Sequence, residues 1–232
     1  MTTQQITHHI NFQASNVNFS EMKKNKMGGK VVYLSNEGRK KLLVQFPKLR
    51  APFGMSEFVD QNTGRSSYSV DVSLDGNDDL QTRFRALDAE IVKLIAKNSK
   101  AWLGKVHTET VIKDVLYKPI VKEPSDPKYS PTLKFKILTN DKNEFIPEAY
   151  NNKRQEVKIS SLEKGQSLKA IAHLSQIWII DNKCGVTMRL EQAFLAPTEK
   201  LKGFAFQDDD EDMGEGAAEE EEEEEEETEY DE

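Results

Sequence analysis

The chain has 232 residues, a mean hydropathy of −0.68 and a formal charge of −8 at pH 7. Cys184, the only cysteine, allows neither an intrachain disulfide nor a zinc site of several cysteines, and no apolar stretch approaches the length of a membrane span. The N-terminus also lacks a signal-peptide layout, so we expect a soluble intracellular protein without a membrane partner.

The N-terminal part is expected to contain a polar arm and a β-hairpin. Residues 1–26 are rich in amide side chains, and their scattered apolar positions favour an edge strand or a mobile arm. Strands are predicted over Lys30–Leu34 and Lys41–Phe46, because a turn-prone segment separates two apolar runs. Pro47 and the Arg50–Gly54 segment are expected to end this hairpin.

A strand and a long helix come next. Apolar and polar residues alternate over Ser66–Leu74, which predicts a half-buried strand. A helix is predicted over about 77–103, because Asn77 can cap it, acidic residues occupy its first turn and apolar residues recur at helical spacing. Gly104 provides the stop, and the apolar stripe is expected to pack in the core.

The rest of the body returns to strands. They are predicted over Val111–Val121, Thr132–Leu138 and Gln155–Leu162, and as a long hairpin of Ser167–Ile180 with Gly185–Ala196. Several strands with one inserted helix indicate a small barrel or sandwich.

Basic residues gather between Met22 and Arg50, where nine Lys and Arg stand against Glu37 alone. A solvated hairpin face would explain them, but aromatic residues lie among them. Basic side chains that pair with phosphates, next to rings on which bases stack, are typical of single-stranded nucleic-acid binding. Outward positions on later strands add further basic and aromatic candidates. The candidate nucleic-acid-binding residues are Lys23, Lys24, Lys26, Lys30, Tyr33, Arg39, Lys40, Lys41, Lys48, Arg50, Phe53, Lys134, Lys136, Trp178 and Arg189.

No pattern for catalysis or metal binding is found. The four histidines belong to no catalytic signature, and Gly28–Lys30 lacks the spacing of a phosphate-binding loop. Asp75–Asp79 lacks the alternating ligands of an EF-hand and is better explained as a turn and helix cap. We therefore expect a non-enzymatic protein without a cofactor or metal.

The acidic C-terminal tail, residues 208–232, holds 18 carboxylates and no basic residue. Residues 1–207 consequently carry 32 basic and 22 acidic residues, a charge of +10. The tail composition predicts disorder, and a polyanion tethered to a basic body competes with any polyanionic ligand. The tail residues expected to act as competitor and as partner-docking segment are Asp208, Asp209, Asp210, Glu211, Asp212, Glu229, Tyr230, Asp231 and Glu232.

Several segments occur in a distinctive order. Ser67–Leu74 leads directly into the predicted helix, Leu133–Ile137 follows, and Gly165–Ala170, Trp178 and Gly185–Gln192 precede the acidic tail. In this order the chain, from about Ser66 onward, resembles the replicative single-stranded-DNA-binding proteins of short-tailed coliphages and their relatives in large eukaryotic DNA viruses. The chain departs from the phage pattern by ending in Tyr-Asp-Glu instead of a terminal phenylalanine.

The resemblance implies an OB-fold: a mainly β, five-stranded barrel with extra strands, one inserted helix at about 77–103 and a disordered acidic tail. It also implies a DNA groove of basic and aromatic side chains. The tail would occupy this groove until DNA displaces it, and would then contact replication proteins such as a polymerase or helicase–primase. We expect an arm over 1–26, an OB domain over 27–206 and a regulatory tail over 207–232.

The sequence thus predicts sequence-tolerant single-stranded DNA binding in viral DNA replication, recombination or repair, in the host cytoplasm or nucleus. It is compatible with a homodimer. Two alternatives stay open: a chaperone for histones or other basic proteins that acts through its poly-Glu tail, and an RNA-binding OB module.

Overall fold

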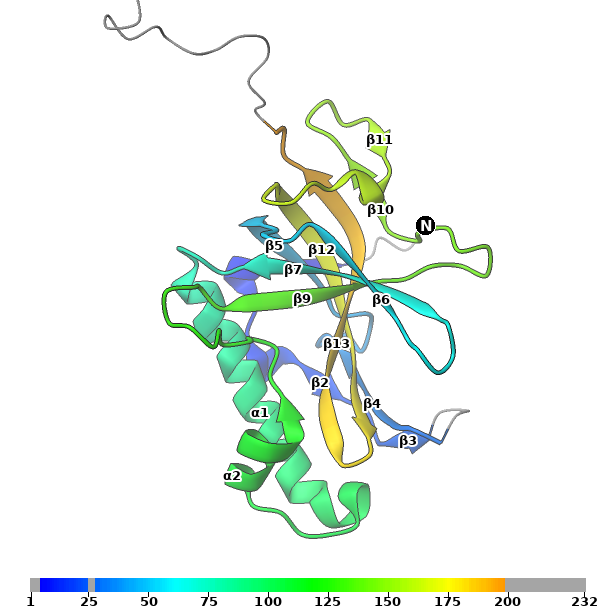
Figure 1. Ribbon diagram of the computed structural model, residues 1–232. Coiled ribbons are helices and arrows are strands. Elements are labelled where there is room, and N and C mark those ends of the chain that lie inside the picture. The colour runs from blue at the N-terminus through cyan, green and yellow to red at the C-terminus, as the bar shows by residue number, and fades with distance from the viewer. Residues whose placement is uncertain (1–4, 25–27, 199–232) are drawn as a thin grey trace, which may run out of the picture. The chain divides into compact units, whose positions relative to one another are not determined.

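The computed structural model describes residues 5–24 and 28–198 (Figure 1). The helices are α1 (Asp78–Leu103) and α2 (Glu109–Val111), which continues as a π-helical turn over Ile112–Leu116, and short 3-10 turns cover His9–Asn11, Ala14–Asn16 and Ile159–Ser161. The strands are β1 (Ile6–His8), β2 (Asn18–Phe19), β3 (Lys23–Lys24), β4 (Lys30–Ser35), β5 (Leu43–Arg50), β6 (Met55–Val59), β7 (Ser66–Ser73), β8 (Tyr117–Lys118), β9 (Thr132–Ile137), β10 (Glu148–Tyr150), β11 (Glu156–Val157), β12 (Ser167–Ile180) and β13 (Lys183–Leu195).

The main strands form an OB-like barrel. β5, β12, β13, β9 and β7 lie next to one another in this order, and β5 also contacts β7. Numbered along the chain, the order is that of the five-stranded OB-fold, with α1 inserted between β7 and β9. The predicted fold class is therefore confirmed. Within the described residues, no helix has both the length and the apolar character needed to cross a membrane.

The core lies between the barrel and α1. Phe84 of α1 stacks on Phe12 and Phe46, with ring centroids 4.9 and 5.4 Å apart, and Phe46 meets Phe135 edge-on at 4.9 Å. The helix ends as predicted, because Gly104 has a φ of 81° and donates its N–H to the carbonyl of Lys100. The predicted apolar stripe of α1 is thus largely core packing.

The β12–β13 hairpin is the longest feature of the sheet (Figure 1). Its turn is Asp181–Asn182, both with positive φ, which is the two-residue turn typical of tight hairpins. Two register shifts interrupt the pairing, and they leave Glu191 of β13 and Ser175 of β12 as the extra residues. Each shift changes which residues face outward, so the outer face carries Trp178 near the turn and Lys169 at the far end.

The structure corrects the predicted hairpin of the N-terminal part. β4 and β5 meet only at the bridge between Ser35 and Lys41, and otherwise pair with different halves of β12. The predicted end at Pro47 is also wrong, since β5 continues to Arg50. Pro47 lies at a register irregularity between β5 and β12, a position at which a strand tolerates proline.

The N-terminal segment, expected as part of a polar arm, packs against the barrel over the residues that the structure describes. β1 is an edge strand parallel to β5, and Phe12 and Val17 are buried in the core. Few apolar positions are present, but these two suffice because each fills a space beside α1 or the sheet. Arg83 adds a hydrogen bond of 3.0 Å to the carbonyl of Phe12.

The strand predicted over Val111–Val121 is largely helical instead. The hydroxyl of Thr108 accepts a hydrogen bond from the N–H of Val111 and caps α2, and Ile112 of the following turn is buried. Only Tyr117 and Lys118 form a strand, which pairs with the start of β13. Of the apolar β-branched residues in this helical part, Ile112 is buried, whereas Val111 and Val115 are exposed.

Candidate nucleic-acid interface

A hollow of about 840 Å³ lies on the outer face of the barrel, between the β8 segment and strands β9, β12 and β13. Its lining combines one tryptophan, several lysines and apolar residues. No acidic residue is among the described residues that line it. The residues that carry its chemistry are Lys118, Lys122, Lys134, Lys136, Trp178 and Gly185.

Trp178 lies flat against the sheet at this hollow. It pairs across the hairpin with Gly185, and a Cβ on Gly185 would fall 2.8 Å from Cζ2 of the indole ring. Such a distance is far inside van der Waals contact, so the ring can adopt this position only because residue 185 is glycine. An indole held in this way, and partly exposed, offers a flat surface on which a planar ring can stack.

Four lysines line the same hollow as the indole ring. Lys118 Nζ lies 5.8 Å from its centroid, within the range of a cation–π contact, and Lys122 follows on the same wall. Lys134 and Lys136 point outward from β9, and Lys134 forms an ion pair of 3.3 Å with Asp71. The predicted outward direction of both β9 lysines is confirmed. Together these ammonium groups supply the positive charge that phosphates require.

A buried carboxylate holds the wall of the hollow in place. Asp88 of α1 accepts hydrogen bonds from the hydroxyl of Tyr117 at 2.6 Å and from the N–H groups of Ile120 and Val121 at 2.9 and 3.3 Å. Burial raises the pKa of Asp88 to about 6, although these hydrogen bonds act in the opposite direction. Because Lys118 lies between Tyr117 and Ile120, Asp88 fixes the backbone that carries the cation over Trp178.

Arg189 lies next to the hollow, opposite Lys136 of β9 and His173 of β12. Its Nε atom is buried and has no hydrogen-bond partner among the described residues. His173 approaches Glu191 at 3.5 Å, and burial, with minor contributions from Lys41 and Arg189, lowers its pKa. A buried guanidinium nitrogen without an acceptor is energetically costly, so the described residues leave this N–H group of Arg189 unsatisfied.

Several predicted residues lie on the face that carries the hollow. Lys134, Lys136 and Trp178 line it, and Arg189 adjoins it. Tyr33 pairs with Gln176 and is 45% exposed, whereas Lys23 pairs with Val31 in the row that contains Trp178. These last two extend the same face across β4 and β3.

Other predicted residues are placed elsewhere. Lys30 donates a hydrogen bond of 2.5 Å to the carbonyl of Trp102, so it caps the C-terminus of α1, and Lys24 pairs opposite it. Phe53 is exposed in the turn after β5. The remaining positions are given by region: Arg39, Lys40 and Lys41 lie in or beside the β4–β5 turn, Lys48 and Arg50 on the outer face of β5, and Lys26 and the tail residues from Asp208 to Glu232 outside the described residues.

Sequence reasoning missed Lys118, Lys122 and the role of Gly185. Lys118 and Lys122 fall in or just after the segment that was predicted to be one strand, where their faces could not be assigned. The signal for Gly185 was present, because a glycine opposite a tryptophan in a long hairpin indicates a ring lying across the strand. It was not used, since the register of the hairpin was not known.

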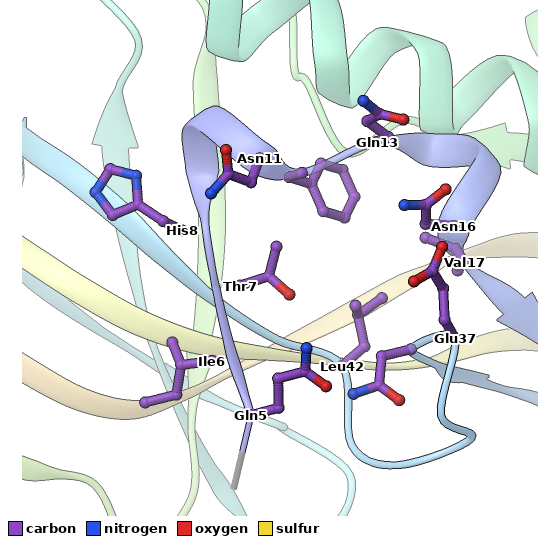
Figure 2. A pocket seen from close by; sticks show the side chains of 12 residues that line it. Gln5, Ile6, Thr7, His8, Asn11, Gln13, Asn16, Val17, Glu37 and Leu42 are labelled. Carbon is purple, nitrogen blue, oxygen red and sulfur yellow. The ribbon is translucent and has the colours of Figure 1, made fainter.

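A second hollow, of about 250 Å³, lies beside the N-terminal segment (Figure 2). Its lining includes the amide side chains of Gln5, Asn11 and Asn16, together with Glu37. Figure 2 shows these side chains around the hollow, together with Leu42. A carboxylate, and no Lys or Arg among the described residues of the lining, make it unsuited to phosphates. The structure contains no cluster of metal-binding side chains in its described residues.

Comparison with known proteins yields structural relatives only. No protein-family model and no curated protein matches the sequence. The single-stranded DNA-binding protein of bacteriophage Enc34, solved in complex with ssDNA, is similar at 12% identity and a TM-score of 0.42, over 78% of this chain and 97% of that one. The single-stranded DNA-binding protein gp2.5 of bacteriophage T7 is similar at 14% identity and a TM-score of 0.41, over 71% and 91%. Likenesses of this size do not assign an activity to the chain.

Proposed function

We propose that this protein binds single-stranded DNA, without strong sequence preference, at the hollow around Trp178. The observation that carries the proposal is the indole ring held flat on Gly185 in a hollow that four lysines line. The ring supplies a stacking surface for any base, and the lysines neutralise phosphates. Neither contact reads the edge of a base, which is why the binding is expected to tolerate sequence changes.

A single strand fits this arrangement better than a duplex. The ring of Trp178 lies inside a hollow, and a base can reach it only after leaving a base stack. In OB-folds, ligands are commonly bound on the face of the second and third barrel strands, which correspond here to β7 and β9. Lys134 and Lys136 lie on that face.

We propose that the acidic tail and the biological role of the protein are linked to this DNA binding. The acidic tail would compete with DNA for the lysines and, once displaced, would dock replication proteins. On the sequence resemblance, the protein would act in viral DNA replication, recombination or repair. It would do so as a binding protein and not as an enzyme.

A binding titration tests the proposal. Fluorescein-labelled oligo-dT, a duplex of equal length, oligo-rU and core histones are each titrated with the wild-type protein and with Trp178→Ala. We expect the wild type to bind oligo-dT most tightly and the variant to bind it about tenfold more weakly, as loss of one stacking ring predicts. Preference for oligo-rU would favour an RNA-binding module, and preference for histones would favour the chaperone.

A further inference from the structure

A third hollow lies at the opposite end of the β12–β13 hairpin from Trp178 and has a volume of about 470 Å³. It is formed where the β10–β11 hairpin approaches the outer face of β5, β12 and β13. The residues that determine its chemistry are Gln45, Tyr150, Arg154, Lys169, Ile171 and Phe194. None of these residues is needed for the contacts at Trp178.

This hollow repeats the combination of a ring and cations. Phe194 lies opposite Lys169, which in turn lies opposite Lys48, so one aromatic and two basic side chains form a row across three strands. Phe194 is 36% exposed, whereas the preceding residue, Ala193, is buried, as expected when successive strand residues face opposite sides. Arg154, in the turn between β10 and β11, adds a third cation.

Two carboxylates lie near the hollow: Glu148, and Glu156, which pairs with Tyr150 across the β10–β11 hairpin. Glu148 accepts hydrogen bonds from the hydroxyl of Tyr150 at 2.9 Å and from the side-chain amide of Gln192 at 3.0 Å. Lys48, Lys169 and Arg154 form no ion pair with another described residue within 4.0 Å. The three cations Lys48, Lys169 and Arg154 outnumber the two neighbouring carboxylates, so the hollow keeps a net positive charge next to an exposed ring, which is the chemistry that a nucleotide requires.

The two hollows are on one continuous face. The extra residues Ser175 and Glu191 change the alternation of β12 and β13 once each, so that Trp178 and Phe194 both face outward. On a strand that rises about 3.3 Å per residue, Trp178 and Lys169 are separated by about 30 Å. Arg189, with its unpaired Nε, lies between them.

We propose that the hollow at Phe194 is a second nucleotide-binding subsite, and that a single DNA strand follows the β12–β13 hairpin from Trp178 past Arg189 to Phe194. This inference rests on the proposed function. Phe194 stacks on a base, and Lys48, Lys169 and Arg154 contact the flanking phosphates. This path would also pass Lys48 and Arg50, which lie far from Trp178.

Binding as a function of oligonucleotide length tests the second subsite. The affinities of the wild type, Phe194→Ala, Phe194→Tyr and Lys169→Ala are measured for oligo-dT of about 4 to about 16 nucleotides, the range of site sizes of single OB-folds. For the shortest oligonucleotides, which can occupy one hollow, Phe194→Ala is expected to match the wild type. For the longest, it binds at least about tenfold more weakly, and Phe194→Tyr restores the affinity.

Matched controls come from the loop after β8. Tyr129 is exposed and has Lys128 beside it, but neither residue lines the hollow at Trp178 or the hollow at Phe194. Tyr129→Ala and Lys128→Ala should therefore bind all lengths as the wild type does. Equal affinity of Phe194→Ala and the wild type at every length overturns the second subsite alone. The same series is measured with oligo-rU, and a length-dependent loss seen only with oligo-rU overturns the assignment to DNA. Absence of any wild-type binding overturns both proposals.

Discussion

At the scale of single residues, the contact between Trp178 and Gly185 determines the proposed site. A hydrogen atom at position 185 leaves the space in which the indole ring lies across the strand. A methyl group there would meet two indole carbons and the carbonyl of Lys118, at 2.8, 3.1 and 3.2 Å. The indole ring and the β8 wall therefore depend on the same glycine.

Gly185→Ala should weaken DNA binding without removing a single contact group. The added methyl group pushes the indole ring off the sheet, and overpacking of this kind costs about 1–3 kcal/mol of stability. We expect the Kd for oligo-dT, measured by fluorescence anisotropy, to rise about tenfold. Gly38→Ala is the matched control, because its nearest neighbour lies at 3.5 Å and it requires no positive φ. Unchanged affinity of Gly185→Ala would show that the position of the ring is irrelevant to binding.

The lysines of the hollow should appear in the salt dependence of binding. Replacing Lys122 or Lys136 by alanine removes one phosphate contact, so the slope of log K against log salt should decrease by about 0.7 for each residue. Lys97→Ala, on the exposed face of α1, should leave the slope unchanged. If Lys97→Ala and Lys136→Ala gave the same slope, the hollow would not be the phosphate-binding face.

At the scale of elements, α1 is tied to the site through Asp88. In the folded protein the pKa of Asp88 is about 6, above its ordinary value of 3.8, mainly because of burial. The folded state therefore holds this proton more tightly than the unfolded chain does. The resulting stabilisation is fully present below about pH 3.8 and is lost as the pH rises through about 6.

Asp88→Asn should remove this pH dependence. Between about pH 7 and about pH 5, the unfolding free energy of the wild type should rise by about 1 kcal/mol relative to that of the variant. Chemical denaturation at both pH values measures the difference. Glu90→Gln, at an exposed carboxylate of the same helix, is the control and should follow the wild type. Parallel curves for the wild type and Asp88→Asn would contradict the assignment of the titration to Asp88.

Some helices and strands could be predicted from the sequence, and others could not. α1, β7 and β9 carry uninterrupted periodicity, and the long hairpin carries it except at Ser175 and Glu191, so the positions of these elements follow from the sequence. The segment from Glu109 to Leu116 does not, because β-branched residues favour a strand locally while the Thr108 cap and the burial of Ile112 favour a helical turn. β4 and β5 resemble a hairpin in sequence, yet both find their partner in β12, far along the chain.

Only part of the candidate site could be predicted, because the position of a side chain depends on strand register. Trp178, Lys134 and Lys136 could be selected as outward positions on well-defined strands. The basic cluster of Met22–Arg50 could be counted but not placed. In the structure, Lys30 caps α1 whereas Lys48 faces outward from β5. Charge density identifies a basic segment, but only strand register decides which of its side chains share a surface.

At the scale of the whole molecule, the central relation is between the basic body and the acidic tail. Residues 1–207 carry a charge of +10 and residues 208–232 carry the 18 carboxylates. Deletion of 208–232 should tighten oligo-dT binding at low salt, because a tethered competitor is removed, and the effect should shrink as salt is added. Equal affinity of the truncated and full-length proteins at low salt would contradict the proposed competition.

DNA binding at the hollow requires direct contact between a base and the ring of Trp178. The chain has two tryptophans, and Trp102 is buried at the end of α1, so the emission of a Trp102→Phe protein comes from Trp178 alone. Titration of this protein with oligo-dT should quench its emission saturably, at the concentrations at which anisotropy reports binding, because a stacked base lies against the indole ring. If anisotropy showed binding while the emission of Trp178 stayed unchanged, this would contradict stacking of a base on Trp178.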